Sequence, residues 1–189
     1  MAKRRLFVGT FLPEAQRPAL AVEAESAARL ADEWHRKLRW VRADKLHLTW
    51  LFLGGVEEAQ IPELEAKVSD LLSEARSMDL AYDDFKLWPH ARKAKTFVLV
   101  PHTVPPELME LAERIKTGLT PFAERVDIKY RPHITVARMD PQPGRIAVPD
   151  WFPVRKSLPL RHHIDRIDLI ESHLGGSKDY ESLRRWDLK

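Results

Sequence analysis

One short pattern occurs twice in the chain, and each copy opens a short apolar segment. His47, one apolar residue and Thr49 begin "HLTWLFLG", while His133, Ile134 and Thr135 begin "HITVAR". Both segments are rich in β-branched or aromatic residues, which is typical of buried strands. Residues two apart on a strand project from the same face, so each histidine shares a face with its threonine.

The segments that precede the two copies also match each other. "RLFVGTFL", a helical stripe and "KLHLTWLFL" form one strand–helix–strand unit, and "TFVLV", another stripe and "HITVAR" form a second. Phe7 precedes His47 by 40 residues, and Phe97 precedes His133 by 36. If the units pack about a pseudo-twofold axis, the two His–Thr pairs face each other across a cleft. The repeat therefore predicts one site built from two half-sites.

Other elements are predicted from the spacing of apolar residues and from turn residues. Apolar residues three and four positions apart predict helices from Leu20 to Leu38, from Ile61 to Ala75 and from Leu108 to Phe122. "MDLAYDDFKLW", "RIDLIESHL" and "YESLRRWDL" are predicted strands, and "DPQPGRIAVPDWFP" and "GGSKDY" are predicted loops. A chain of 189 residues without a domain linker fits one domain, or two small lobes that share a core.

Composition excludes several kinds of site. The chain has no cysteine, which removes disulfides, thiolate nucleophiles and zinc–cysteine sites, and which fits a cytosolic protein. Its longest apolar runs, such as "LTWLFL", are too short to cross a bilayer. It has no Gly-rich phosphate loop, no Gly-x-Ser-x-Gly elbow and no His-Glu-x-x-His. Adjacent His162 and His163 would point to opposite faces of a strand, so we predict packing or surface roles and no metal site.

Two histidines on opposite sides of a reacting centre can divide acid and base catalysis between them. Histidine is the side chain best able to do both near neutral pH, so one can deprotonate water while the other protonates a leaving oxygen. Threonine hydroxyls can donate hydrogen bonds to phosphate oxygens as charge builds. Because attack and departure occur on opposite faces of phosphorus, the pattern indicates a phosphodiester substrate.

Basic residues gather just before both histidines. They either capture a phosphate-bearing partner or are solvated loop charges balanced by the 28 acidic residues, and the net charge of +3 is compatible with both. Three aromatic residues nearby, Trp40, Trp88 and Tyr130, either stack on bases or pack in the core. The basic residues form three clusters: Arg36, Lys37, Arg39, Arg42 and Lys45; Arg125, Lys129 and Arg131; and Arg92, Lys93 and Lys95.

Four segments resemble a known family. "RLFVGTFLP", "LHLTWLFLG", "RPHITVAR" and "SHLGGSKDYESL" are similar to the two-histidine phosphoesterase superfamily, and in particular to its RNA 2′,3′-cyclic phosphodiesterase branch, the LigT-like proteins once named 2′-5′ RNA ligases. The similarity covers nearly the whole chain. One His-x-Thr alone carries no weight, whereas two in this framework are specific.

The resemblance implies a fold, a reaction and roles for residues. The expected fold is α+β and bilobal, one two-lobed domain over residues 1–189 with antiparallel sheets lining a central cleft. The expected reaction is hydrolysis of an RNA terminal 2′,3′-cyclic phosphate, or of a cyclic nucleotide, to a 2′-phosphomonoester without a metal or other cofactor. The expected protein is a cytoplasmic monomer with no membrane partner.

Five residues carry roles by this resemblance. His47 and His133 would be catalytic, and Thr49 and Thr135 would contact the phosphate. Arg138 matches a phosphate-binding arginine of the family. Strict alternation turns Arg138 away from His133, so a bulge, strand twist or the long side chain itself is needed to bring it back.

Two other functions remain open on the sequence alone. The same residues could perform 2′-5′ RNA ligation, which reverses transesterification at the same site. The chain could also be a nucleotide- or RNA-binding module without turnover, although both histidines are present. We favour hydrolysis because water is abundant and ligation runs against it.

Overall fold

The computed structural model describes most of the chain. It covers residues 2–20, 22, 24, 38–89, 95–126, 129–139, 155–173 and 180–189. Most of the first predicted helix and both predicted loops lie outside these ranges. Among the described residues, no helix has both the length and the apolar character needed to cross a membrane.

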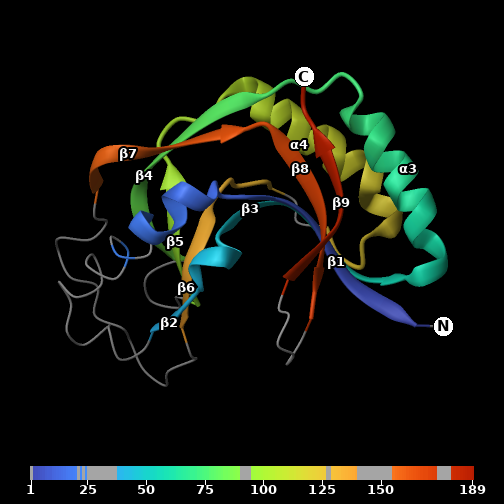
Figure 1. Ribbon diagram of the computed structural model, residues 1–189, viewed down its shortest axis with the longest axis horizontal. Coiled ribbons are helices and arrows are strands. Elements are labelled where there is room, and N and C mark those ends of the chain that lie inside the picture. The colour runs from blue at the N-terminus through green and yellow to red at the C-terminus, as the bar shows by residue number, and fades with distance from the viewer. Residues whose placement is uncertain are drawn as a thin grey trace.

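The strands form one antiparallel sheet in the order β7-β4-β5-β6-β3-β1-β8-β9, with β2 paired to β6. Figure 1 shows that the sheet curls into an arch. The strands, in chain order, are β1 (Lys3–Phe11), β2 (Leu38–Trp40), β3 (His47–Glu57), β4 (Met78–Trp88), β5 (Thr96–Pro101), β6 (Ile134–Met139), β7 (Arg155–Ile164), β8 (Arg166–Ser172) and β9 (Tyr180–Asp187).

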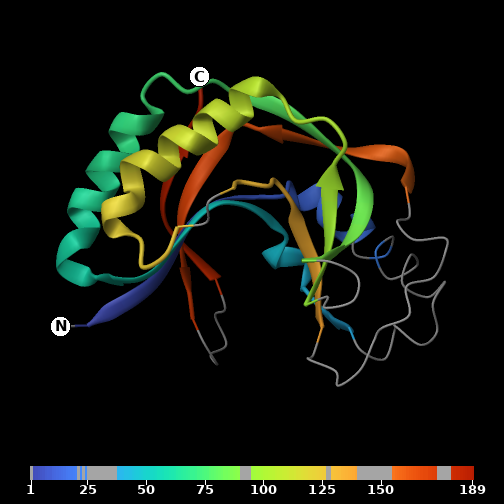
Figure 2. The same ribbon diagram turned by 180° about the vertical axis from the view of Figure 1, so that it is seen from behind.

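Two long helices cover the outside of the half of the sheet that contains β1, β8 and β9 (Figures 1 and 2). They are α3 (Ile61–Leu72) and α4 (Pro106–Leu119). Each has a proline in its first turn, where no intrahelical N–H bond is lost. Their buried residues, such as Leu64 and Val68 on α3 and Leu111 and Ile115 on α4, are those of the predicted stripes. The described residues also form four short 3₁₀ turns, η1 (Glu14–Gln16), η2 (Ala43–Lys45), η3 (Glu58–Gln60) and η5 (Thr120–Phe122), and residues 17–20, 22 and 24 are helical.

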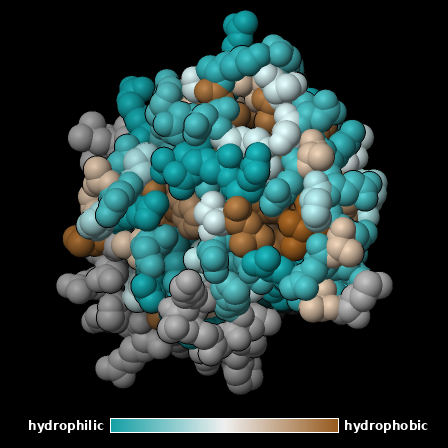
Figure 3. Space-filling model, turned by 45° about the vertical axis from the view of Figure 1, so that its right-hand side comes forward, coloured by the Kyte–Doolittle hydropathy of each residue, from teal (hydrophilic) through white to brown (hydrophobic). Residues whose placement is uncertain are grey.

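The first predicted stripe is wrong at its far end. Leu38 fits the helical spacing, but it begins β2 and pairs with Met139 of β6. Strand pairing there satisfies the backbone and half-buries Leu38, and the periodic spacing alone cannot reveal that alternative. The face shown in Figure 3 is mostly hydrophilic, with some apolar side chains near its centre. Large apolar side chains that are exposed among the described residues are Val22, Phe52 and Met109.

The two halves of the sheet meet at a single residue pair. Strands β7, β4, β5 and β6 form one half, and β3, β1, β8 and β9 form the other. They join where Leu48 of β3 pairs with Ile134 of β6. The pseudo-twofold axis of the two strand–helix–strand units therefore passes between the two His-x-Thr patterns. This confirms the predicted α+β fold with two pseudo-symmetric units.

Candidate active site

The four side chains of the two patterns occupy the same face of the sheet. Leu48 and Ile134 are both fully buried on the opposite, core face. Because residues directly opposite each other in a sheet share a face, continuing the register by one residue places His47 across from Thr135 and Thr49 across from His133. All four are partly exposed.

This register puts the two histidines at diagonal corners of a four-residue array. Diagonal neighbours across an antiparallel pair are separated by roughly 7–8 Å. That spacing leaves room for one phosphate group between the imidazoles, with a threonine at each remaining corner. The predicted half-sites therefore lie together as one site.

Both imidazoles are held in the same way. His47 Nδ1 lies 2.6 Å from the carbonyl oxygen of Lys45, and His133 Nδ1 lies 2.8 Å from that of Arg131. A carbonyl oxygen can only accept, so Nδ1 must carry the proton in each ring. This fixes the tautomer and leaves Nε2 of each ring as the nitrogen that can exchange a proton with a substrate.

Each of the two strands contains a bulge one residue after its threonine. On β6, Thr135 pairs with Val98 and Ala137 with Phe97, so Val136 is the extra residue. On β3, Trp50 is extra in the same way, between two residues that pair with adjacent positions of β1. A bulge shifts the alternation of side chains by one position.

The bulge on β6 returns Arg138 to the face of His133. Val136 and Ala137 are both buried, and Arg138 is exposed. This is the local irregularity that the sequence required for Arg138 to reach the site. The charge of Arg138 also contributes to lowering the pKa of His47, so the two side chains interact electrostatically. By the pseudo-symmetry, Phe52 occupies the place on β3 that Arg138 occupies on β6.

Aromatic rings surround both histidines. The ring of His47 lies 4.9 Å from that of Phe7 and 5.3 Å from that of Tyr180, measured between centroids. The ring of His133 lies 4.5 Å from that of Trp88. These contacts remove water from one side of each imidazole.

Burial therefore depresses both imidazole pKa values. The pKa of His47 falls from 6.5 to about 4, mainly through desolvation, with smaller contributions from the charges of His133 and Arg138. Desolvation also lowers the pKa of His133, and the bond to the Arg131 carbonyl partly offsets it. Both rings are therefore neutral at pH 7 in the empty site.

The other sequence candidates divide between packing and the site. Trp40 packs on Phe97, and Tyr130 stacks on buried Trp50, so the packing interpretation holds for these two aromatic residues. Trp88 differs because it contacts the His133 ring, and both Trp88 and Tyr130 line an open groove.

The basic clusters divide as well. Arg42 forms a bidentate ion pair with the carboxylate of Asp44. Arg125, Lys129 and Arg131 line the groove beside His133. Arg36, Lys37, Arg92 and Lys93 lie outside the described residues.

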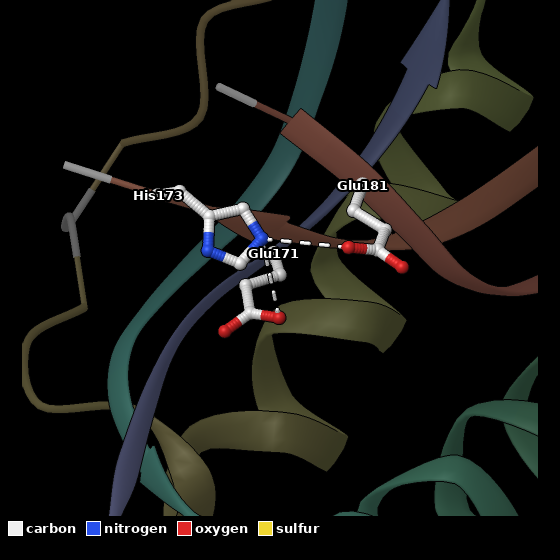
Figure 4. A group of neighbouring side chains, drawn as sticks. All are labelled: Glu171, His173 and Glu181. Atoms are coloured by element: carbon white, nitrogen blue, oxygen red, sulfur yellow. Dashed lines mark ion pairs between the residues drawn. The ribbon is translucent and has the colours of Figure 1, made fainter. Parts of the chain in front are cut away.

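His162 and His163 point to opposite faces, as the sequence predicts for neighbours on a strand. His162 is buried, and His163 is exposed and bonds Asp79. Within the part of the chain that the structure describes, one group of side chains could hold a metal ion. It consists of Glu171, His173 and Glu181, whose potential ligand atoms lie within 4.8 Å of one another (Figure 4).

That cluster belongs to the other face of the sheet. Glu171 pairs with Glu181 across β8 and β9, while Ser172 pairs with Tyr180, the residue that contacts His47. Alternation therefore turns the two glutamates away from His47. The guanidinium of Arg4 also bonds the Glu171 carboxylate and lowers its pKa. The cluster is thus a charge-paired group outside the candidate site.

Sequence reasoning missed three parts of the site. Phe7 and Tyr180 reach His47 through β1 and β9, and Tyr180 lies at the far end of the chain without a local signal. Phe52 stands in the HLTWLF segment at the same distance from His47 as Arg138 from His133. That equal spacing was the available signal, because both patterns carry the same bulge.

Comparisons with known proteins agree with this architecture. A Bacillus subtilis protein named RNA 2′,3′-cyclic phosphodiesterase is 26% identical over 183 residues, covering 96% of this chain and 95% of that protein. A solved structure from Thermus thermophilus has 28% identity and a TM-score of 0.77, covering 97% of both chains. The Escherichia coli LigT structure with phosphate has the same fold, with 23% identity, a TM-score of 0.75, and coverage of 100% and 99%. The 2′-5′ RNA ligase superfamily matches residues 17–176, and this chain belongs to that family.

Proposed function

We propose that this chain hydrolyses the terminal 2′,3′-cyclic phosphate of RNA to a 2′-phosphomonoester. The observation that carries the proposal is the matched tethering of His47 and His133, which leaves one Nε2 from each half-site free to exchange protons. The B. subtilis relative, with 26% identity, and a Thermotoga maritima relative, also 26% identical over 139 residues, are both named RNA 2′,3′-cyclic phosphodiesterase. Membership of a phosphoesterase family supports an enzyme, and the cyclic phosphate is the finer part of the proposal.

The proposed reaction is a single in-line displacement. His133 takes a proton from water, and the water oxygen forms a bond to phosphorus. The bond from phosphorus to O3′ breaks, and protonated His47 gives its proton to O3′. The products are a 3′-hydroxyl and a 2′-phosphomonoester, so atoms and charge balance without a metal or redox step.

The threonines and the arginine would act on the phosphate itself. The Thr49 and Thr135 hydroxyls would donate to the two non-bridging oxygens, where negative charge builds during attack. Arg138 would offset that charge. Assignment of His47 as acid and His133 as base rests on the family resemblance, because the two His-x-Thr patterns are equivalent in sequence terms.

Binding of the substrate must change the protonation of the site. Both imidazoles are neutral at pH 7 when the site is empty, because desolvation lowers both pKa values. A bound anionic phosphate stabilises the imidazolium and raises the pKa of His47. The substrate would therefore help to charge the acid that its own reaction needs.

Product analysis tests the proposal. The protein is incubated with an RNA oligonucleotide that ends in a 2′,3′-cyclic phosphate, and the product is separated from 2′- and 3′-phosphate standards. We expect only the 2′-phosphate. A His47→Ala/His133→Ala double variant, purified in the same way, controls for contaminating nucleases. A 3′-phosphate product, or equal turnover by the double variant, would contradict the proposal.

One second activity has specific support, since the family description names 2′-5′ RNA ligation. In that reaction a ribose 5′-hydroxyl would replace the attacking water. Adding excess 5′-hydroxyl RNA to the same assay separates the two activities, and we expect hydrolysis to dominate. An RNA-binding role without turnover predicts no product at all.

The proposal also covers the context of the enzyme. We take residues 1–189 as one two-lobed domain that acts as a monomer in the cytoplasm. A chain without cysteine has no thiol to protect or oxidise there.

A further inference from the structure

A groove opens from one end of the candidate site. It has a volume of about 750 Å³ and begins at Thr49 and His133, which face each other across β3 and β6. His47, Thr135 and Arg138 do not line it. The volume lies within the range that accommodates a drug-sized ligand and exceeds the space that one phosphate needs. The groove therefore extends beyond the chemistry on the His133 side.

The charged side chains that line the rest of the groove are all basic. Its lining includes Arg125, Lys129 and Arg131, all exposed. No carboxylate among the described residues forms an ion pair with these three side chains. Lys116, which also lines the groove, is paired with Glu113. Three cations around one groove, none paired with a described carboxylate, favour a polyanion.

Aromatic rings alternate with these cations. Trp88 contacts both the His133 ring and the Arg131 guanidinium, which is 5.8 Å from the centre of the indole ring. On the other strand, Phe52 is 42% exposed and carries the Arg5 guanidinium 4.8 Å from its ring centre. Exposed rings interleaved with cations are the features that bind single-stranded nucleic acid, whose bases stack while its phosphates are neutralised. An acidic peptide would match the charge but has no bases to stack.

A second cavity continues the groove. Its volume is about 390 Å³, and it shares Trp88, Lys129 and Arg131 with the first. It extends the surface to Lys86 and to exposed Met109 on α4. The combined surface is therefore longer than a single nucleotide requires.

We infer that this groove binds single-stranded RNA beside the reacting phosphate, with Arg125 and Lys129 contacting backbone phosphates and Phe52 and Trp88 stacking on bases. We call the surface lined by Phe52, Trp88, Arg125, Lys129 and Arg131 the chain groove. The identity of the reacting end rests on the proposed function, but the binding of RNA in the groove does not. The protein would therefore prefer oligonucleotides to cyclic mononucleotides.

Binding measurements on the full chain test this inference. The probes are a fluorescent RNA pentamer that ends in a 2′-phosphomonoester and the matching mononucleotide, which competes for binding. The variants are Lys129→Ala, Arg125→Ala and Phe52→Ala. Arg131 and Trp88 are left intact because they touch or orient His133. Lys67→Ala and Arg76→Ala, both exposed and outside the groove, are matched charge controls.

Each cation removed should weaken pentamer binding about fivefold at 0.1 M salt and reduce the slope of log K against log salt by about 0.7. Loss of the Phe52 ring should also cost about fivefold or more, and Phe52→Tyr should restore it. For Lys129→Ala and Arg125→Ala, mononucleotide affinity and turnover of the cyclic mononucleotide should stay within twofold of the unmodified protein. The controls should bind both probes normally.

Other outcomes overturn specific parts of the account. Normal pentamer binding by all three variants would reject the chain groove while leaving the enzymatic proposal intact. Displacement of the pentamer by poly-glutamate of equal charge as effectively as by RNA would identify an acidic protein segment as the occupant. Loss of cyclic-phosphate turnover in the unmodified protein, with pentamer binding still dependent on Lys129, would reject the enzymatic proposal and keep the groove.

Discussion

At the residue scale, the most informative feature is the environment of the two imidazoles. Each donates Nδ1–H to the carbonyl of the residue two positions earlier, and each lies against aromatic rings. The tether fixes the tautomer, and the rings lower the pKa by desolvation. Orientation and pKa are thus set by neighbours that a two-residue pattern does not contain.

The lowered pKa values predict an acidic profile for kcat/KM, which reports the free enzyme. The acid must be protonated, so activity falls as pH rises above the pKa of the acid. The base must be neutral, so activity also falls as pH drops below the pKa of the base. With the pKa of His47 at about 4 and that of His133 also below 6.5, the alkaline limb of kcat/KM should lie below pH 6.5. The limb of kcat should lie higher, because bound phosphate raises the pKa of His47.

Arg138 provides the matched variants for that profile. Its charge lowers the pKa of His47, so Arg138→Met should move the alkaline limb of kcat/KM upward while weakening substrate binding. Arg138→Lys keeps the charge and should leave the limb in place. Steady-state profiles of the three proteins measure both effects. A kcat/KM limb at or above the kcat limb would show that this electrostatic account of the site is wrong.

The residues of the repeat could be predicted from the sequence, but their neighbours could not. Alternation places His47 with Thr49 and His133 with Thr135, and the structure agrees. Arg138 could be aligned with the family but not placed, because a bulge at Val136 changes the alternation and has no period of its own. The roles of these residues in catalysis remain predictions.

At the element scale, β1 connects the two strands that flank it through one buried hydroxyl. Thr10 accepts a hydrogen bond from Trp50 on β3 and donates one to the Arg166 carbonyl on β8. Both Thr10 and Trp50 are nearly inaccessible to solvent. A buried hydrogen bond that loses one partner leaves the other unsatisfied.

Thr10→Val should therefore destabilise the fold while preserving side-chain shape. We expect a loss of about 1–3 kcal/mol in the free energy of unfolding, measured by chemical denaturation. Thr117→Val is the control, because Thr117 is exposed on α4 and its contact to Glu113 is 3.5 Å long. A change there should stay within about 0.5 kcal/mol. Equal stability of the Thr10 and Thr117 variants would argue against a structural role for the buried hydroxyl.

The hairpin of β8 and β9 carries the candidate ligands Glu171, His173 and Glu181 on the face opposite His47. Activity should therefore persist after exhaustive chelation, and Glu181→Gln should turn over cyclic phosphate at the normal rate. The measurement is turnover after dialysis against EDTA, with and without added divalent ions. Complete loss that a divalent ion restores would refute the metal-independent mechanism.

Elements with strong local patterns were predictable, and elements decided by distant pairing were less so. The stripes of α3 and α4 appear in the sequence because each helix buries one face. Leu38 fits the helical spacing but belongs to β2. Its strand partner, Met139, is distant in sequence, so the local spacing could not predict this pairing.

At the scale of the whole molecule, three of the histidines that the structure describes have lowered pKa values. His162 is the most buried, with a pKa of about 4 caused mainly by desolvation. The unfolded chain binds a proton near pH 6.5, and the folded chain does not until pH 4. The stabilisation is therefore fully present above pH 6.5 and is lost as pH falls from 6.5 toward 4.

His162→Phe should reduce this acid-induced loss of stability. The shift of the His162 pKa corresponds to a contribution on the order of 3 kcal/mol. Denaturation at pH 7 and pH 4 measures the difference, and the His163→Ala variant, whose histidine is exposed, should keep the normal loss. An unchanged loss in His162→Phe would assign acid sensitivity to other groups.

The repeat predicted the pseudo-twofold arrangement of the two units, but it did not predict where the strands outside those units would lie. Two equivalent strand–helix–strand units imply a pseudo-twofold axis, and the structure has one between Leu48 and Ile134. The placement of β8 and β9 beside β1 could not be read from the repeat, because those strands lie outside both units. This placement brings Tyr180 to His47 and makes the two half-sites chemically different.

The central claim is that two symmetric imidazoles divide acid and base catalysis. With an unactivated cyclic phosphate, His47→Ala and His133→Ala should each lose ~10²–10⁴-fold in rate, with the fold retained. The decisive measurement repeats the comparison with a substrate whose 3′ leaving group is an activated alcohol of low pKa. Such a group needs little protonation, so the account predicts that His47→Ala recovers most of its rate and His133→Ala does not. Recovery by His133→Ala instead would reverse the two roles, and near-normal turnover of the unactivated substrate by either folded variant would contradict the two-histidine mechanism itself.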